Sequence, residues 1–417
     1  MNNIKYYLRD EKKNTKRVVS YVILYSLALN TFFLRGFDVP LNLPYIDSLS
    51  YFIPILIALS SVFVLFTTLQ YNTRIDHVTI YMMFLFICCS SLSFVYNISA
   101  FSRNGVVFIF FTEFWANIAL FAVTIILSQY VRAKNILYSI FLSGVVFSAI
   151  VIYIALTIGG ARRIGNTELA IGVNHLSHGM AVAFVVGVCR YYYQDGNNIF
   201  GIAGLTVILS GLILTGSRSA LLGVGMSVVI FMALLERDTI FRFARTIVTA
   251  SFGILFISLV AIDLPGITNR LLSIDYLAGS LAYRGNRYLE TISIAVSNPV
   301  STLFGVGVHN YVPLSIGEPI IYDPHNIWLS FALYLGIPAA LTYTVLHAYI
   351  FTSLLRLSIS IREEERIAVL LSLVIVSVYV FFSGRMTRIY TIWLIMGLAV
   401  EQLYQSSDRI SFNKNQC

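Results

Sequence analysis

Charged residues and cysteine are scarce in this chain. Only 12% of its 417 residues are charged and 58% are hydrophobic, whereas soluble proteins carry about 25% charged residues. This composition excludes a soluble globular domain. The four cysteines, two of them adjacent inside an apolar run, do not form the framework of a small disulfide-bonded domain. The formal net charge of +8 is expected of cytoplasmic loops in a membrane protein and gives no signal for nucleic acid.

Common catalytic and metal-binding motifs are also missing. The sequence has no G-x-S-x-G nucleophile elbow, no Walker A loop and no H-E-x-x-H metal motif. His175 and His178 share one helix face, but no carboxylate accompanies them at the spacing of a ligand set. We therefore expect no metal and no cofactor.

Long apolar runs fill most of the chain. A helix needs about 20 apolar residues to cross a hydrocarbon core of about 30 Å. We expect an all-α polytopic membrane protein with about 12 transmembrane helices, whose boundaries are defined to about two to four residues. The twelve runs are 18–34, 51–70, 78–98, 106–129, 136–158, 174–190, 198–214, 219–235, 244–262, 326–350, 367–383 and 389–404.

The distribution of Lys and Arg predicts the orientation of these spans. With a cytoplasmic N-terminus, 18 of the 28 cations lie in inner segments, as the positive-inside rule requires. The ten outer cations are all Arg, whose guanidinium binds phosphate bidentately. This assignment gives five parts: a cytoplasmic basic N-terminus (1–17), spans one to nine (18–262), a periplasmic loop (263–325), spans ten to twelve (326–404) and a cytoplasmic tail (405–417).

The connection 263–325 is the one long loop, and loops of this length are usually functional or disordered. An apolar-periodic stretch that begins at Arg284 and stops at Asn298-Pro299 predicts a short helix. Its expected faces are an apolar one and a basic one: Leu289, Ile292 and Val296 against Arg284, Arg287 and Thr291.

Polar residues cluster in the outer connections, where they are candidates for function because polar groups beside the bilayer are costly. Arg218 lies in a connection of only about four polar residues, so it must sit at the membrane boundary. Pro324 suits the first turn of a helix and Asp323 its cap. His325 then begins the tenth span, where an imidazole can take a proton from a hydroxyl. The alternative is that these are helix-end and capping groups without a chemical role.

The order of these pieces resembles the bacterial O-antigen ligase and O-antigen polymerase family of inner-membrane glycosyltransferases. In that family a short outer Arg turn precedes a long periplasmic loop with an Arg-led helix that ends in Pro. A Gly-x-Gly and then a His-Asn at the start of the next span follow, with a Gly about ten residues on. This chain supplies Gly216-Ser217-Arg218, Arg284 to Pro299, Gly305-Val306-Gly307, and His325-Asn326 with Gly336.

The resemblance implies a binding site for a glycan donor linked to undecaprenyl diphosphate. It places diphosphate binding on Arg218 and Arg284. Arg287, one turn later, is a further candidate for diphosphate binding, although it departs from the family spacing to the Pro. Arg162 and Arg163 are similar to the family only in character and remain candidate donor contacts.

The resemblance also places action on the acceptor hydroxyl at His325, which Asp323 is positioned in sequence to orient. Fixed Arg donors at a water-poor interface can stabilise the charge that develops on the leaving diphosphate. Because that group departs readily, no general acid is required. The resemblance also implies an enzyme that is independent of metals, in agreement with the missing ligand set.

We expect an O-antigen ligase that transfers a polysaccharide to a lipid A-core acceptor at the periplasmic face of the bacterial inner membrane, in lipopolysaccharide biosynthesis. A repeat-unit polymerase with the same donor remains an alternative. A flippase for lipid-linked oligosaccharides is a third, but it predicts charges at mid-membrane, whereas the charges here cluster on the outer face. The expected partners are donor, acceptor and membrane lipids, without nucleic acid.

Overall fold

The computed structural model describes residues 2–33, 77–97, 106–158, 173–193, 199–235, 274–307, 324–382 and 390–414. Every regular element in these ranges is a helix, which agrees with the predicted fold class. In chain order the helices are α1 (Asn2–Phe32), α3 (His77–Tyr96), α5 (Val106–Ser128), α6 (Ala133–Ile158), α8 (Val173–Tyr193), α9 (Ile199–Thr215), α10 (Arg218–Leu234), α13 (Ile274–Ala295), α14 (Pro299–Phe304), α15 (Ile327–Leu335), α16 (Ile337–Ser360), α17 (Glu364–Phe382) and α18 (Tyr390–Lys414).

Several of these helices have the length and apolarity of membrane spans. Among the described residues, four helices meet both criteria, namely α3, α6, α16 and α17, and α5, α9 and α10 contain shorter apolar stretches. Ten of the twelve predicted runs fall on described helices, and the runs 51–70 and 244–262 lie outside the described residues. The helical membrane architecture is thus supported, and the number of 12 spans stays a prediction.

The predicted run 326–350 is not one helix, which corrects the sequence interpretation. The chain forms α15, breaks at Gly336 and begins α16 at Ile337. Gly336 has φ +90°, a conformation that favours glycine, and Pro338 in the first turn of α16 fits the start of a helix but not its interior. Because α15 has only nine residues, the element able to span the bilayer is α16.

The helix expected in the long loop begins earlier than predicted. α13 runs from Ile274 instead of Arg284, and it ends at Ala295, close to the predicted stop. Asn298 then caps α14: its side chain accepts from the backbone N of Ser301 at 2.9 Å, while the Ser301 hydroxyl interacts with the backbone N of Asn298. This reciprocal capping box fixes the turn between the two helices.

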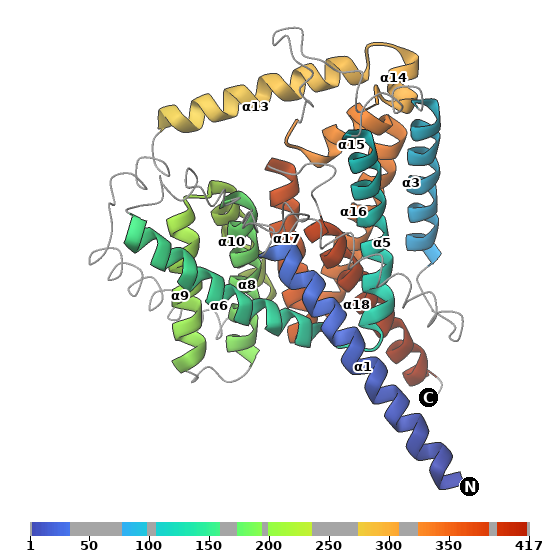
Figure 1. Ribbon diagram of the computed structural model, residues 1–417, viewed down its shortest axis with the longest axis vertical. Coiled ribbons are helices and arrows are strands. Elements are labelled where there is room, and N and C mark those ends of the chain that lie inside the picture. The colour runs from blue at the N-terminus through green and yellow to red at the C-terminus, as the bar shows by residue number, and fades with distance from the viewer. Residues whose placement is uncertain are drawn as a thin grey trace, which may run out of the picture.

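α17 is the central helix of the bundle. Nearly all of its side chains from Arg366 to Val380 are buried, as expected of an apolar helix enclosed by protein on all sides. Helices α8, α10, α16 and α18 pack against it. Figure 1 shows α13 and α14 across one end of this bundle, with the two termini of the chain at the opposite end.

The first turn of α17 is an ionic junction with α6. Lys134 Nζ lies 2.7 Å from Glu364 Oε2, and the Lys134 backbone N donates to Glu365 Oε1 at 3.0 Å. A carboxylate at the N-terminus of α6 is favourable because of the helix dipole. This junction lies at the end of α17 opposite to the one that contacts α13.

Candidate functional site

The C-terminal end of α17 is the place where α13 and α15 meet. The carbonyl oxygen of Phe381 accepts two hydrogen bonds, one from Tyr288 Oη on α13 at 3.2 Å and one from Asn326 Nδ2 at the start of α15 at 3.1 Å. The last carbonyls of a helix have no partners within that helix. Both helices therefore dock on a group that α17 leaves available.

Arg284 lies one turn before Tyr288 on α13 and is directed to the same helix end. Its guanidinium carbon is 5.8 Å from the centroid of the Phe382 ring, near the outer limit of a cation–π contact. Within the described residues, no acceptor forms a hydrogen bond with this guanidinium. Arg287 is arranged differently, because its guanidinium carbon lies 4.7 Å from the ring of Tyr283 on the same helix.

The two predicted faces of α13 are present, and the apolar one is exposed. Leu289 is 69% exposed, Ile292 46% and Val296 52%, whereas Thr291 on the opposite side is fully buried. The basic side of α13 is consequently the side that faces the end of α17.

Arg218 is brought to the level of this helix end by the packing of α10 on α17. Gly223 lies against Ile375, and Ser227 Oγ donates to the Leu371 carbonyl at 3.2 Å. Ser227 lies four residues after Gly223 on α10, whereas Leu371 lies four residues before Ile375 on α17, so the two helices are antiparallel. Continued to the start of α10, this register sets Arg218 level with the last turn of α17.

The turn before Arg218 is tight. Gly216 has φ +64°, and the backbone N of Ser217 donates to Thr215 Oγ1 at 3.3 Å. Ser217 is the N-cap of α10, but its side chain forms no capping hydrogen bond. Arg218 is the first residue of α10, and the start of a helix is suited to an anion.

α8 also reaches this end of α17, through Tyr379. His175 Nδ1 lies 3.2 Å from Tyr379 Oη, and the rings of His178 and Tyr379 are 4.3 Å apart. His175 Nε2 additionally bonds the Thr31 carbonyl of α1. His175 therefore ties three helices together. In the described part of the chain, no group of three His, Cys, Asp or Glu residues could hold a metal ion.

His325 has a strained backbone just before α15. Its φ of +54° lies in the left-handed region, which is uncommon for residues other than glycine. Pro324 and Asn326 on either side are buried, whereas His325 is only partly so. The strain is sustained by Asn326, which accepts from the backbone N of Leu329 at 3.0 Å while holding α17.

This geometry corrects the predicted cap of the helix. Asn326 is the N-cap of α15 and Ile327 its first residue, so the expectation that Asp323 caps the helix and that Pro324 opens it is wrong. His325 precedes the helix. Asp323 itself lies outside the described residues, as do Arg162 and Arg163.

The glycines of the motif have a structural cause. At Gly305 (φ +71°) a side chain would overlap the backbone of α15, and at Gly336 it would overlap the Leu303 carbonyl. The backbone N of Val306 donates to the Leu333 carbonyl at 2.8 Å. Only glycine permits these approaches, which lock α14 onto the junction of α15 and α16 and so fix α13 relative to His325.

Arg218, Arg284 and His325 are thus carried by elements that converge on one helix end, while Arg287 stacks on its own helix. The sequence analysis did not identify Tyr288 or Phe381. Tyr288 could have been identified from the sequence, because it lies four residues after Arg284 on the same helix face. Phe381 contributes a backbone carbonyl, which leaves no trace in side-chain patterns.

One comparison with known proteins finds a match in the part of the chain that carries these residues. Residues 203–344, about a third of the chain, match the family model described as O-antigen ligase. This segment runs from α9 to the first turns of α16 and contains Arg218, Arg284 and His325. No curated protein matches the chain significantly. Over this segment the chain is similar to the O-antigen ligase family.

Proposed function

We infer that this protein transfers a glycan from undecaprenyl diphosphate to an acceptor hydroxyl at the end of α17. The observation that carries the proposal is the convergence of α10, α13 and the segment just before α15 on that helix end, with Arg218, Arg284 and His325 on them. Arg218 and Arg284 would hold the donor diphosphate, as bidentate guanidinium groups do.

His325 is assigned the acceptor side of the reaction. Its imidazole removes the proton from the acceptor hydroxyl, and the acceptor oxygen forms a bond to the anomeric carbon. The bond between that carbon and the diphosphate oxygen breaks, and its electron pair stays on the diphosphate. The two Arg side chains stabilise the charge on this leaving group. In this scheme no metal takes part, and Asp323 orients the imidazole.

The acceptor that we propose is lipid A-core, so the enzyme would be an O-antigen ligase of the bacterial inner membrane with its site in the periplasm and both termini in the cytoplasm. Repeat-unit polymerisation uses the same donor and the same chemistry. A flippase is less favoured, since Lys134 and Arg284 contact the two ends of α17 and not its middle.

Deletion of the gene, followed by gel analysis of lipopolysaccharide, tests the function. Free lipid-linked polymer with bare core supports the ligase, whereas a core that carries one repeat unit assigns the polymerase. Unchanged lipopolysaccharide contradicts both.

Transfer by the purified protein is expected to survive EDTA. An activity lost in EDTA and restored by one added metal would overturn the metal-free mechanism.

A further inference from the structure

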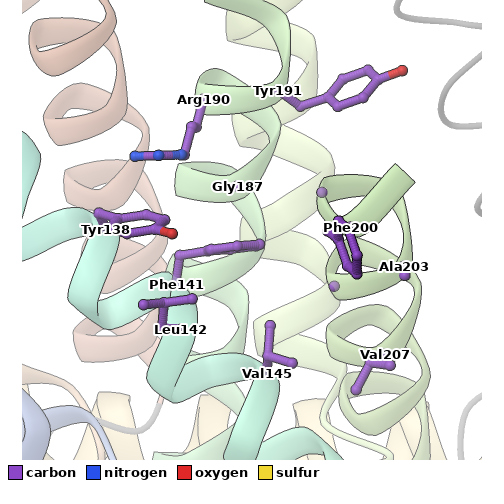
Figure 2. Close-up of a pocket in the computed structure, with 12 residues that line it drawn as sticks. Tyr138, Phe141, Leu142, Val145, Gly187, Arg190, Tyr191, Phe200, Ala203 and Val207 are labelled. Atoms are coloured by element: carbon purple, nitrogen blue, oxygen red, sulfur yellow. The ribbon is translucent and has the colours of Figure 1, made fainter. Parts of the chain in front are cut away.

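A cavity of about 390 Å³ opens between α6, α8 and α9, away from the site described above. Figure 2 shows apolar side chains of α6 and α9 on its two walls, with Arg190 and Tyr191 of α8 at one end and Val145 and Val207 toward the other. Pockets for small molecules measure roughly 300–1,000 Å³. The cavity therefore has the volume of a binding site.

Glycines shape the floor and wall of the groove by letting neighbouring side chains approach the backbone. Gly187, Gly201 and Gly204 all line it. The Phe141 ring lies against Gly187, where a side chain would overlap it. The lining residues of α9 extend over about two helical turns, so the groove is roughly 10 Å long. This shape fits an extended hydrocarbon chain.

The groove is open at the outer surface of the bundle. Phe200 is 82% exposed and Leu142 47%, and both line it. α6 is one of the helices long and apolar enough to cross a membrane. Its exposed apolar residues lie on the outer surface of the helix bundle. In a membrane, that surrounding is lipid.

The mouth of the groove carries Arg and Tyr, residue types that are typical of the lipid headgroup region. The guanidinium carbon of Arg190 lies 3.6 Å from the centroid of the Tyr138 ring, and three consecutive tyrosines, residues 191–193, end α8. Tyrosines at helix ends mark the boundary between hydrocarbon and water. Arg190 therefore lies where a lipid phosphate would be.

The charges around Arg190 favour an anion. The nearby carboxylates are Glu364, which is paired with Lys134 Nζ, and Glu365, which accepts from the Lys134 backbone. Within the described residues, no carboxylate forms an ion pair with Arg190. Its planar fork is suited to phosphate oxygens.

We propose that this groove binds an anionic phospholipid, with an acyl chain between α6 and α9 and its phosphate on Arg190. The site joins the three helices at the end of the bundle opposite to the candidate active site. It does not depend on the proposed glycosyl transfer.

Photo-crosslinking tests the proposal in the full-length protein reconstituted in bilayers. The probes are phosphatidylglycerol and phosphatidylcholine that carry a diazirine in one acyl chain, and labelled peptides are mapped by mass spectrometry. We expect labels on α6 and α9 at the groove, with phosphatidylglycerol preferred. Arg190→Gln should lower phosphatidylglycerol labelling there by about tenfold, because charge-assisted hydrogen bonds are lost, while Arg356→Gln, an exposed Arg outside the groove, leaves it unchanged.

Filling the groove gives a second, independent variant. A Cβ at Gly201 meets only Tyr191, at an ordinary 3.5 Å, and Gly201 lines the cavity. We therefore expect the protein to fold with Gly201→Leu and the leucine to occupy the cavity. It should abolish labelling of the groove by both lipids, whereas Gly225→Leu, at an open helix position, should not. Equal labelling by the two lipids in the unaltered protein, an unchanged preference in Arg190→Gln, or no label at the groove would overturn the proposal.

Discussion

Tyr288 and Asn326 donate hydrogen bonds to one acceptor, the carbonyl oxygen of Phe381, at 3.2 Å and 3.1 Å. Tyr288 belongs to the helix that carries Arg284, and Asn326 follows His325 directly. One backbone atom thus sets the distance between the proposed donor-binding and acceptor-activating residues. Such precision is what catalysis by positioning requires.

The first prediction concerns Tyr288. Tyr288→Phe keeps the ring and loses the hydrogen bond that docks α13, so transfer activity should fall about two- to tenfold, as for the loss of one hydrogen bond. The donor KM should rise more than kcat falls, because Arg284 moves with α13. Tyr283→Phe is the matched control, since its ring can still stack on Arg287. Equal kinetics in the two variants would show that the docking contact is dispensable.

Asn326 has two functions that two substitutions separate. Asn326→Ala removes the cap of α15 and should lower the free energy of unfolding by about 0.5–2 kcal/mol. Asn326→Asp keeps the oxygen that accepts from Leu329 but loses the amide that holds Phe381. The Asp variant should retain more stability than the Ala variant and yet lose transfer activity. Thermal unfolding in detergent, measured beside turnover, distinguishes them, and an active Asp variant would contradict the bridging role.

The proposed roles of the Arg and His residues predict different kinetic defects. Arg218→Ala and Arg284→Ala should weaken donor binding by about 1.5–3 kcal/mol, the range for hydrogen bonds to charged groups. Lys should restore binding only in part, because it lacks the bidentate fork. His325→Ala should lower kcat by about 10² to 10⁴ with donor affinity retained. Full activity of well-folded His325→Ala protein would falsify the base assignment.

Donor affinity is measured with a soluble polyprenyl diphosphate on the purified variants. Unchanged affinity in both Arg variants would remove the diphosphate site. Asp323→Asn should cause a milder defect than His325→Ala, since in our proposal it acts only through the imidazole. A defect equal to that of His325→Ala would instead require a direct role for Asp323.

The glycine interlock gives a prediction about stability. In Gly336→Ala a methyl group would overlap the Leu303 carbonyl at a φ of +90°, so the free energy of unfolding should fall by at least about 2 kcal/mol. Gly279→Ala in α13 is the control. Its Cβ has nothing within 4 Å, and the helix should gain about 0.5–1 kcal/mol. A Gly336→Ala protein as stable as the control would show that α14 is not locked in place.

Features that depend on local sequence could be predicted, whereas features that depend on tertiary packing could not. Helices were predicted over apolar runs because length and apolarity are local properties, and the motif signals at Arg218 and His325 are local as well. The break at Gly336 also had a local signal, Pro338 two residues later. The choice between Asp323 and Asn326 as cap did not, since both residue types cap helices and only the folded position of α17 decides between them.

The register of α10 on α17 and the shared carbonyl of Phe381 could not be predicted. Both arise from tertiary packing between segments distant in the chain, and a backbone carbonyl has the same chemistry at every position. The sequence therefore indicated which residues to consider, and the fold determined that they meet at one helix end.

The last prediction concerns which side of the membrane this helix end faces. The excess of Lys and Arg in the inner segments predicts that α13 lies in the periplasm and the start of α6 in the cytoplasm. The native cysteines are first replaced by Ser, and single Cys residues are introduced at Glu290 and Arg132, both exposed. An impermeant maleimide should label Glu290→Cys in intact spheroplasts, and it should label Arg132→Cys only after permeabilisation. The two variants control for each other, because one introduced Cys is expected to react before permeabilisation and the other only after it. The reverse pattern would place the Arg and His residues in the cytoplasm, where a periplasmic acceptor cannot reach them, and the ligase assignment would fail with the topology.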